Sequence, residues 1–206
     1  MQAITDLIMY FHKGGLVMWP LLACSITVIA IAIERFIYYK SVDSGAAFAS
    51  RYCAAVRSGD FAVATELARK GSGQCAQMLA DVAAIAGGKA AKSAFLESRA
   101  GIFMATLRDK LDYLGIIVTM SPLLGLLGTI VGMIGAFSIF NVEAGAPMAI
   151  TGGIGEALIA TATGLCVAIL SLCAHSYFAH RMDNMITDME QCFSALLEAE
   201  TRRGRS

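Results

Sequence analysis

The chain has 206 residues, of which 57% are hydrophobic and 16% are charged, and its formal net charge is zero. Soluble domains average about 45–50% apolar and about 25% charged residues, so this composition is typical of a membrane protein. The basic residues are scattered and balanced by acids, which argues against nucleic acid as a partner.

The N-terminal part predicts two membrane-associated segments. Residues 1–15 carry apolar side chains at helical spacing and predict an amphipathic helix on the outer membrane surface. Residues 16–33 are uncharged and end at Glu34, and we expect a first transmembrane helix over residues 16–38. The apolar side chains of the opening segment are Ile4, Leu7, Ile8 and Phe11.

The middle of the chain, residues 39–111, is rich in alanine with scattered charge and predicts a cytoplasmic helical loop. Asp60 is placed to cap a helix over residues 61–70, and a Gly-Ser-Gly run supplies its stop. A second helix is expected over about residues 74–86. From about Ala90 the helical pattern runs without a breaker into the next apolar stretch, so this helix is expected to project below the membrane.

Two further apolar stretches predict transmembrane helices over residues 112–140 and 152–178. They are joined by a short turn on the outer side over residues 141–151 and followed by a cytoplasmic helical tail over residues 179–206. The fold class predicted is an all-α membrane protein with three transmembrane helices and long helices extending into the cytoplasm.

The lysines and arginines predict the orientation of these helices, because short loops enriched in them stay on the cytoplasmic side. Eleven lie between residues 35 and 110 and four in the tail, whereas only Lys13 precedes the first apolar stretch. We therefore expect a multi-pass protein whose N-terminus faces outward and whose C-terminus is cytoplasmic.

Glu156 is the only charge in the apolar stretch over residues 147–178. Ionising a carboxylate in hydrocarbon costs several kcal/mol, so such an acid usually faces a bundle interior or a wet pathway and takes part in ion or proton movement. The alternative is an interfacial acid that caps the first turn of the helix.

Small or weakly polar residues recur every three or four positions along the second transmembrane helix. In lipid, such residues let helix backbones approach closely. Thr129 lies in the middle of this stripe, and a hydroxyl bond back to its own helix is the structural alternative for it. Pro122 predicts a kink that neighbouring groups can tolerate. The stripe consists of Ser121, Gly125, Gly128, Thr129, Gly132, Gly135 and Ala136.

In the third transmembrane helix, Glu156 and Thr163 share a face, while Thr161 lies about 140° away. Either the nearby glycines bend the helix, or Thr161 faces a neighbouring helix while Glu156 faces a lumen. Three helices are too few to enclose a water path around Glu156, and the small-residue stripe needs close partners. A homo-oligomeric ring with a shared pore satisfies both demands.

The cysteines predict neither a cofactor nor a metal site. Cys24, Cys166 and Cys173 lie in apolar helices, and no CxxC or Cys/His spacing occurs, so we expect buried, inert thiols. An intramembrane enzyme using Glu156 as general acid or base would need a second polar group within reach, and the apolar helices offer only Thr and Ser. A passive scaffold is a further alternative.

Two stretches of sequence carry a family resemblance. Residues 121–133 read SPLLGLLGTIVGM and residues 153–165 read GIGEALIATATGL. Both resemble the MotA/TolQ/ExbB proton channel family, and its ExbB branch most closely. The resemblance extends to the order of segments along nearly the whole chain.

The resemblance implies a pentameric ring in the bacterial inner membrane around the single-span helices of an ExbD-like partner. Proton flow down the proton motive force would energise a TonB-like protein for transport across the outer membrane. Glu156 would be the pore glutamate, and Thr129 and Thr161 would line the proton pathway near the partner's aspartate, the main proton carrier. Thr163 adds a hydroxyl where the family often has Ile.

The same resemblance leaves alternatives within the family. A TolQ-like subunit of the Tol-Pal envelope system fits nearly as well, because helices that grip different partners look alike. A flagellar stator subunit of the MotA type fits less well, since that branch has four spans and lacks this glutamate. No cofactor or metal is expected. Helix packing is assigned to Gly125, Gly128, Gly132 and Pro122.

Overall fold

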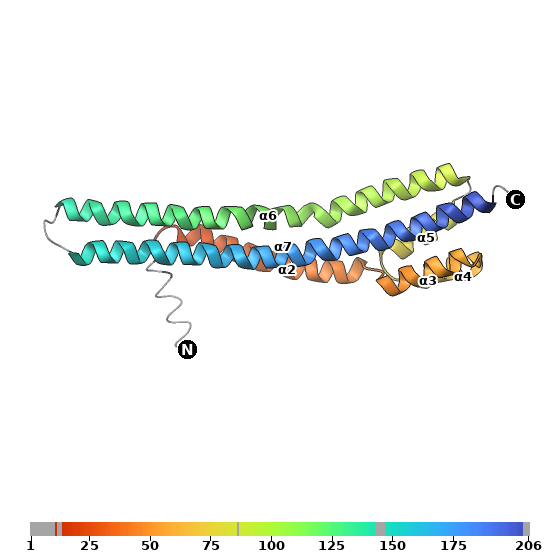
Figure 1. The fold of residues 1–206 in the computed structure, drawn as a ribbon, viewed down its shortest axis with the longest axis horizontal. Helices are drawn as coiled ribbons and strands as arrows, with labels where there is room; N and C mark the ends of the chain where they lie inside the picture. The colour runs from red at the N-terminus through yellow and green to blue at the C-terminus, as the bar shows by residue number, and fades with distance from the viewer. Residues whose placement is uncertain (1–10, 12–13, 86, 143–146, 204–206) are drawn as a thin grey trace. The chain divides into compact units, whose positions relative to one another are not determined.

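A computed structural model describes residues 11, 14–85, 87–142 and 147–203 (Figure 1). The described residues are almost entirely helical, so the expected all-α class is confirmed. The predicted surface helix over residues 1–15 lies mostly outside the described residues. The helices are α2 (Met18–Val42), α3 (Ala46–Arg57), α4 (Phe61–Lys70), α5 (Gln74–Ala83), α6 (Lys89–Val142) and α7 (Pro147–Arg203).

Three of these helices, α2, α6 and α7, are long and apolar enough to cross a membrane, which confirms the three predicted apolar helices. The chain divides into two compact units. Unit 1 comprises Met1–Ile33 and Leu111–Ser176, and unit 2 comprises Glu34–Lys110 and Tyr177–Ser206. Unit 1 thus holds the apolar parts of the long helices, and unit 2 holds α3, α4, α5 and the charged parts.

In unit 1, α6 and α7 pack with almost no side chain between them. A methyl group on Gly164 would lie 2.6 Å from the backbone carbonyl oxygen of Ser121, and one on Gly128 would lie 2.5 Å from the Cβ of Ala160. The buried residues of the small-residue stripe of α6 are therefore covered by α7 of the same chain, whereas Gly135 is exposed. This corrects one step of the sequence argument, because the stripe by itself does not require a second subunit.

The stripe belongs to a longer buried row that continues along α6 at the same spacing of three and four. Its members from Ser121 to Ala136 are small, and the helix backbones approach closely there, whereas most members before them are large, because the distance between helix axes follows the side chains at the contact. The small members are Ser121, Gly125, Gly128, Gly132 and Ala136, and the earlier members are Leu96, Ala100, Phe103, Leu107, Leu111 and Leu114.

The local predictions for unit 2 are largely confirmed. Asp60 caps α4, its carboxylate accepting a hydrogen bond from the Val63 N–H at 3.1 Å, and the helix ends at Lys70 as expected. Helix α5 ends at Ala83, earlier than the expected end at about residue 86, and Ala84 is its C-cap. Helix α6 runs from unit 2 into unit 1 without interruption, and Pro122 lies inside it.

Two further expectations need correction. The turn expected over residues 141–151 is shorter, since α6 reaches Val142 and α7 begins at Pro147, a residue well suited to the first helical position. Cys166 and Cys173, expected to be buried, are exposed because they lie on a face of α7 that this chain does not cover; Cys24 is buried.

A charged cluster in unit 2 joins α2 to α6. Arg35 is only 4% exposed; it donates hydrogen bonds to both carboxylate oxygens of Glu34, at 2.7 and 2.8 Å, and to the carbonyl of Thr106 at 3.1 Å. Lys110 lies 3.2 Å from the same glutamate. Each charge has a partner, as burial of an arginine requires.

Asp188 of α7 lies against a small hollow in unit 2 that Asp43 also lines. Burial raises the pKa of Asp188, and the negative charge of Asp43 adds to the effect. A carboxyl group whose pKa is raised in the folded state stabilises the fold at pH values below its unfolded-state pKa. This contribution is lost as the pH rises through the folded-state pKa.

We therefore expect Asp188→Asn to give a modest increase in the melting temperature of the purified protein at pH 7. The increase should vanish below about pH 4, where the carboxyl is protonated in both states. Asp183→Asn, an exposed acid on the same helix, is the control and should change little. A lower melting temperature for Asp188→Asn at pH 7 would contradict the assignment.

Candidate functional site

Glu156 lies on α7 in unit 1 and is half-buried. Because α7 begins at Pro147, the acid lies in the third turn of the helix. The favourable effect of a helix N-terminus on an acid falls off within the first turn. This position argues against the capping alternative.

The Glu156 carboxylate lies against the turn that precedes α2. A methyl group on Gly15 would lie only 1.9 Å from its Oε1 atom, and Gly15 has a φ of +71°, a conformation that favours glycine. Two independent constraints therefore require glycine at this position. Nothing in the sequence connects Gly15 with an acid 141 positions away.

Thr161 does not share the Glu156 face. Its Oγ1 donates a hydrogen bond to the backbone carbonyl of Gly125 at 3.1 Å, which links α7 to α6 within the chain. Of the two arrangements considered for this helix, Thr161 thus adopts the one in which it faces a neighbouring helix. The close approach of the two backbones at Gly125 is what brings donor and acceptor within reach.

The other two threonines bond to their own helices. Thr129 Oγ1 donates to the Leu126 carbonyl at 2.7 Å, and Thr163 Oγ1 donates to the Ile159 carbonyl at 2.8 Å. Each hydroxyl proton is thereby committed, while the oxygen retains lone pairs that can accept a hydrogen bond from water. Within one chain the three threonines and Glu156 do not converge on a common point.

Two serines between α6 and α7 were not predicted as functional residues. Ser171 is fully buried and donates a hydrogen bond to the Leu114 carbonyl at 2.9 Å, so it links the helices as Thr161 does. Ser121 is also fully buried, and its Oγ has no hydrogen-bond partner among the described residues. Ser171 lies seven residues after Gly164 on α7, and Ser121 lies four residues before Gly125 on α6; this helical spacing is the signal that could have identified them.

The chemical capacity of the site is that of one carboxylate in the apolar part of α7. The ion pairs between described residues all lie in unit 2, and none involves Glu156. The described part of the chain also contains no group of three His, Cys, Asp or Glu side chains arranged to hold a metal ion. Such a carboxylate can exchange a proton or shape the local electric field.

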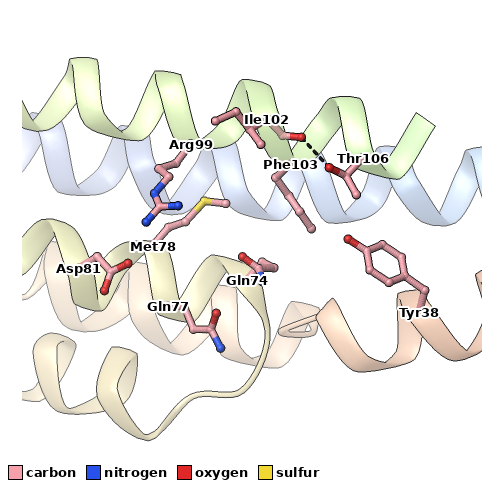
Figure 2. A pocket seen from close by; sticks show the side chains of 9 residues that line it. All are labelled: Tyr38, Gln74, Gln77, Met78, Asp81, Arg99, Ile102, Phe103 and Thr106. Carbon is pink, nitrogen blue, oxygen red and sulfur yellow. Dashed lines mark hydrogen bonds between the residues drawn. The ribbon is translucent and has the colours of Figure 1, made fainter. Parts of the chain in front are cut away.

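A separate hollow of about 300 Å³ lies in unit 2 between α2, α5 and α6 (Figure 2). Arg99 of α6 points toward α5, which contributes Asp81 and the buried Met78, and Tyr38 lies at the other end. The Thr106 hydroxyl at its edge bonds back to the carbonyl of its own helix at 3.0 Å. It contains neither Glu156 nor the predicted threonines.

Comparisons with known proteins identify the family. A profile of the MotA/TolQ/ExbB proton channel family matches residues 74–191. Putative biopolymer transport protein ExbB-like 1 of Synechocystis sp. is 34% identical over 170 residues, which cover 79% of this chain and 66% of that protein. ExbB-like 3 of the same organism is 30% identical over 164 residues, covering 77% of this chain and 78% of that protein.

A third relative, Tol-Pal system protein TolQ of Pseudomonas aeruginosa, is 36% identical over 81 residues, or 39% of this chain and 35% of that protein. The chain spans just under two thirds of the first Synechocystis relative. Fold and site define a multi-pass, all-helical membrane protein with one acid in the apolar part of its third long helix. The chain belongs to the MotA/TolQ/ExbB proton channel family.

Proposed function

We propose that this chain is the ring-forming subunit of a proton-driven motor in the bacterial inner membrane. Together with an ExbD-like single-span partner, it uses the proton motive force to energise a TonB-like protein for transport across the outer membrane. The N-terminus lies in the periplasm, and unit 2 and the C-terminus lie in the cytoplasm. The distribution of lysine and arginine supports this orientation.

One observation carries the proposal: Glu156 is the only charge in the apolar part of α7, lies beyond the first turn, and stands in the sequence GEALIATATGL within the region that the family profile matches. An ionisable residue at such a position marks an ion or proton pathway.

A homopentameric ring supplies the enclosure that one chain lacks. Large apolar side chains on α6 and α7 are exposed in the single chain, among them Leu123 at 65%, Ile134 at 64% and Leu158 at 64%. Lipid and neighbouring subunits together cover these faces. In the ring, Glu156 and the hydroxyls of Thr129 and Thr163 line the pore, where threonine oxygens accept hydrogen bonds from water, while Thr161 holds α7 against α6 beside it. The partner's aspartate carries most of the proton transfer.

A TolQ-like role in the Tol-Pal envelope system is the second candidate. The 36% identity to the Pseudomonas protein supports it, although that match covers a smaller part of the chain than the ExbB-like matches. The packing within unit 1 is compatible with both roles, because it concerns α6 and α7 of the chain itself.

Copurification tests the proposal. A tagged copy of the full chain, extracted from membranes in mild detergent, should bring down a single-span subunit with an aspartate in its membrane helix. Loss of siderophore or vitamin uptake on deletion of the gene would assign the TonB-dependent role, and detergent sensitivity with normal uptake would assign the Tol-Pal role. Recovery of the ring without any Asp-bearing subunit would overturn the proposal.

A further inference from the structure

A second hollow in unit 2 lies where the apolar stretches of α2 and α7 give way to charged sequence. Its volume is about 440 Å³, and its lining combines aromatic and charged side chains from the C-terminal part of α2, the segment after it and the middle of α7. The residues that bear on its chemistry are Phe36, Lys40, Asp43, Tyr177 and Arg181.

One cation in this hollow has no ion-pair partner among the residues that the structure describes. Arg181 forms an ion pair with Asp43, whose other carboxylate oxygen accepts a hydrogen bond from the Gly45 N–H at 2.8 Å. Lys40 is exposed in the last turn of α2, and none of the ion pairs between described residues involves it. The hollow therefore carries a net positive charge and free N–H donors on Lys40 and Arg181.

Four aromatic side chains line the hollow, of which Tyr39 and Phe178 are buried and two are exposed. Phe36 is 55% exposed and Tyr177 is 57% exposed, and the adjacent Ile37 on α2 is 64% exposed. Aromatic side chains beside basic ones at the end of an apolar helix are typical of the membrane interface, where rings lie at the level of the headgroups. The exposed apolar surface of α2 continues from this point, as a path for acyl chains requires.

We propose that this hollow binds the headgroup of an anionic phospholipid. The phosphate accepts hydrogen bonds from the Lys40 ammonium and from those guanidinium N–H groups of Arg181 that do not contact Asp43. The aromatic side chains pack against the glycerol and the upper part of the acyl chains. Basic pockets between membrane helices bind anionic headgroups in this way. A soluble phosphate would use the same donors but would gain nothing from the exposed aromatic and aliphatic walls.

The test measures lipids retained by the full-length protein, extracted together with its natural partners and reconstituted with equal amounts of phosphatidylglycerol and phosphatidylcholine. Native mass spectrometry should find phosphatidylglycerol enriched on the wild type. Lys40→Gln should lower that enrichment about five-fold, the effect expected for one basic residue near an anionic surface. Lys40→Arg should retain it, since the charge is kept.

Lys89→Gln is the matched control, because it removes one exposed lysine of unit 2 that does not line the hollow, and it should behave as the wild type. Equal retention of the two lipids by the wild type, or undiminished enrichment in Lys40→Gln, would overturn the proposal. Displacement of the bound phosphatidylglycerol by inorganic phosphate would assign the hollow to a soluble anion and would also overturn it.

Discussion

Glu156→Gln should abolish siderophore or vitamin uptake in cells that depend on this chain, while its membrane level and assembly remain normal. Glutamine keeps the size of the side chain and its packing against Gly15 but removes the titratable group. In the proposed motor, each subunit then lacks the acid that shapes the pore field. Glu156→Ala, which removes the carboxylate altogether, should give the same loss.

The matched control for this experiment is Glu190→Gln, which neutralises an exposed acid on the same helix in unit 2 and should leave uptake unchanged. Uptake is measured with a labelled siderophore, and assembly by gel filtration of the detergent-solubilised protein. Uptake at the wild-type rate in the Glu156→Gln variant would contradict the motor proposal and favour a passive scaffold.

Gly164→Ala should destabilise the protein, although alanine is ordinarily a better helix former than glycine. The added methyl group would meet the backbone of α6, at 2.6 Å from the Ser121 carbonyl oxygen and 3.0 Å from the Cα of Gly125. Backbone atoms cannot move aside as a flexible side chain can, so α6 and α7 must separate. Overpacking of this kind typically costs about 1–3 kcal/mol.

Gly152→Ala provides the control, since it lies on the same helix and a methyl group there would meet nothing within 4 Å. It should leave the melting temperature of the detergent-solubilised protein unchanged or raise it slightly. Equal stability of the Gly164 and Gly152 variants would contradict close backbone packing of the two helices.

Thr161→Val removes the hydrogen bond to Gly125 and should cost about 0.6 kcal/mol of unfolding free energy, the average for such bonds between membrane helices.

The boundaries of α4 in unit 2 were predictable because they depend on neighbouring residues. Asp60 satisfies a free N–H at the start of α4, and a glycine follows its last turn, so both ends follow from a few positions of sequence. The continuity of α6 was predictable for the same reason, since no breaker stands between Lys89 and the apolar stretch.

The candidate site was predictable only in part. A lone charge in an apolar stretch identifies Glu156 from composition alone, and helical geometry places Thr161 on another face. The partner of each residue depends on which helices meet, and that is a property of the packed chain. Gly15 beside Glu156 and Gly125 beside Thr161 are contacts between segments far apart in sequence.

The sequence by itself determined the class of protein, the three apolar helices and the acid in the third, because hydropathy, charge and local capping act over one or a few helical turns. Only the tertiary structure decided that the small-residue stripe of α6 packs against α7 of the same chain. It also decided that the Glu156 carboxylate lies against the turn before α2. The physical reason is that a stripe of small residues favours close approach of a second helix without specifying which helix. A helix of the same chain and a helix of another subunit differ only in shape complementarity summed over the whole interface.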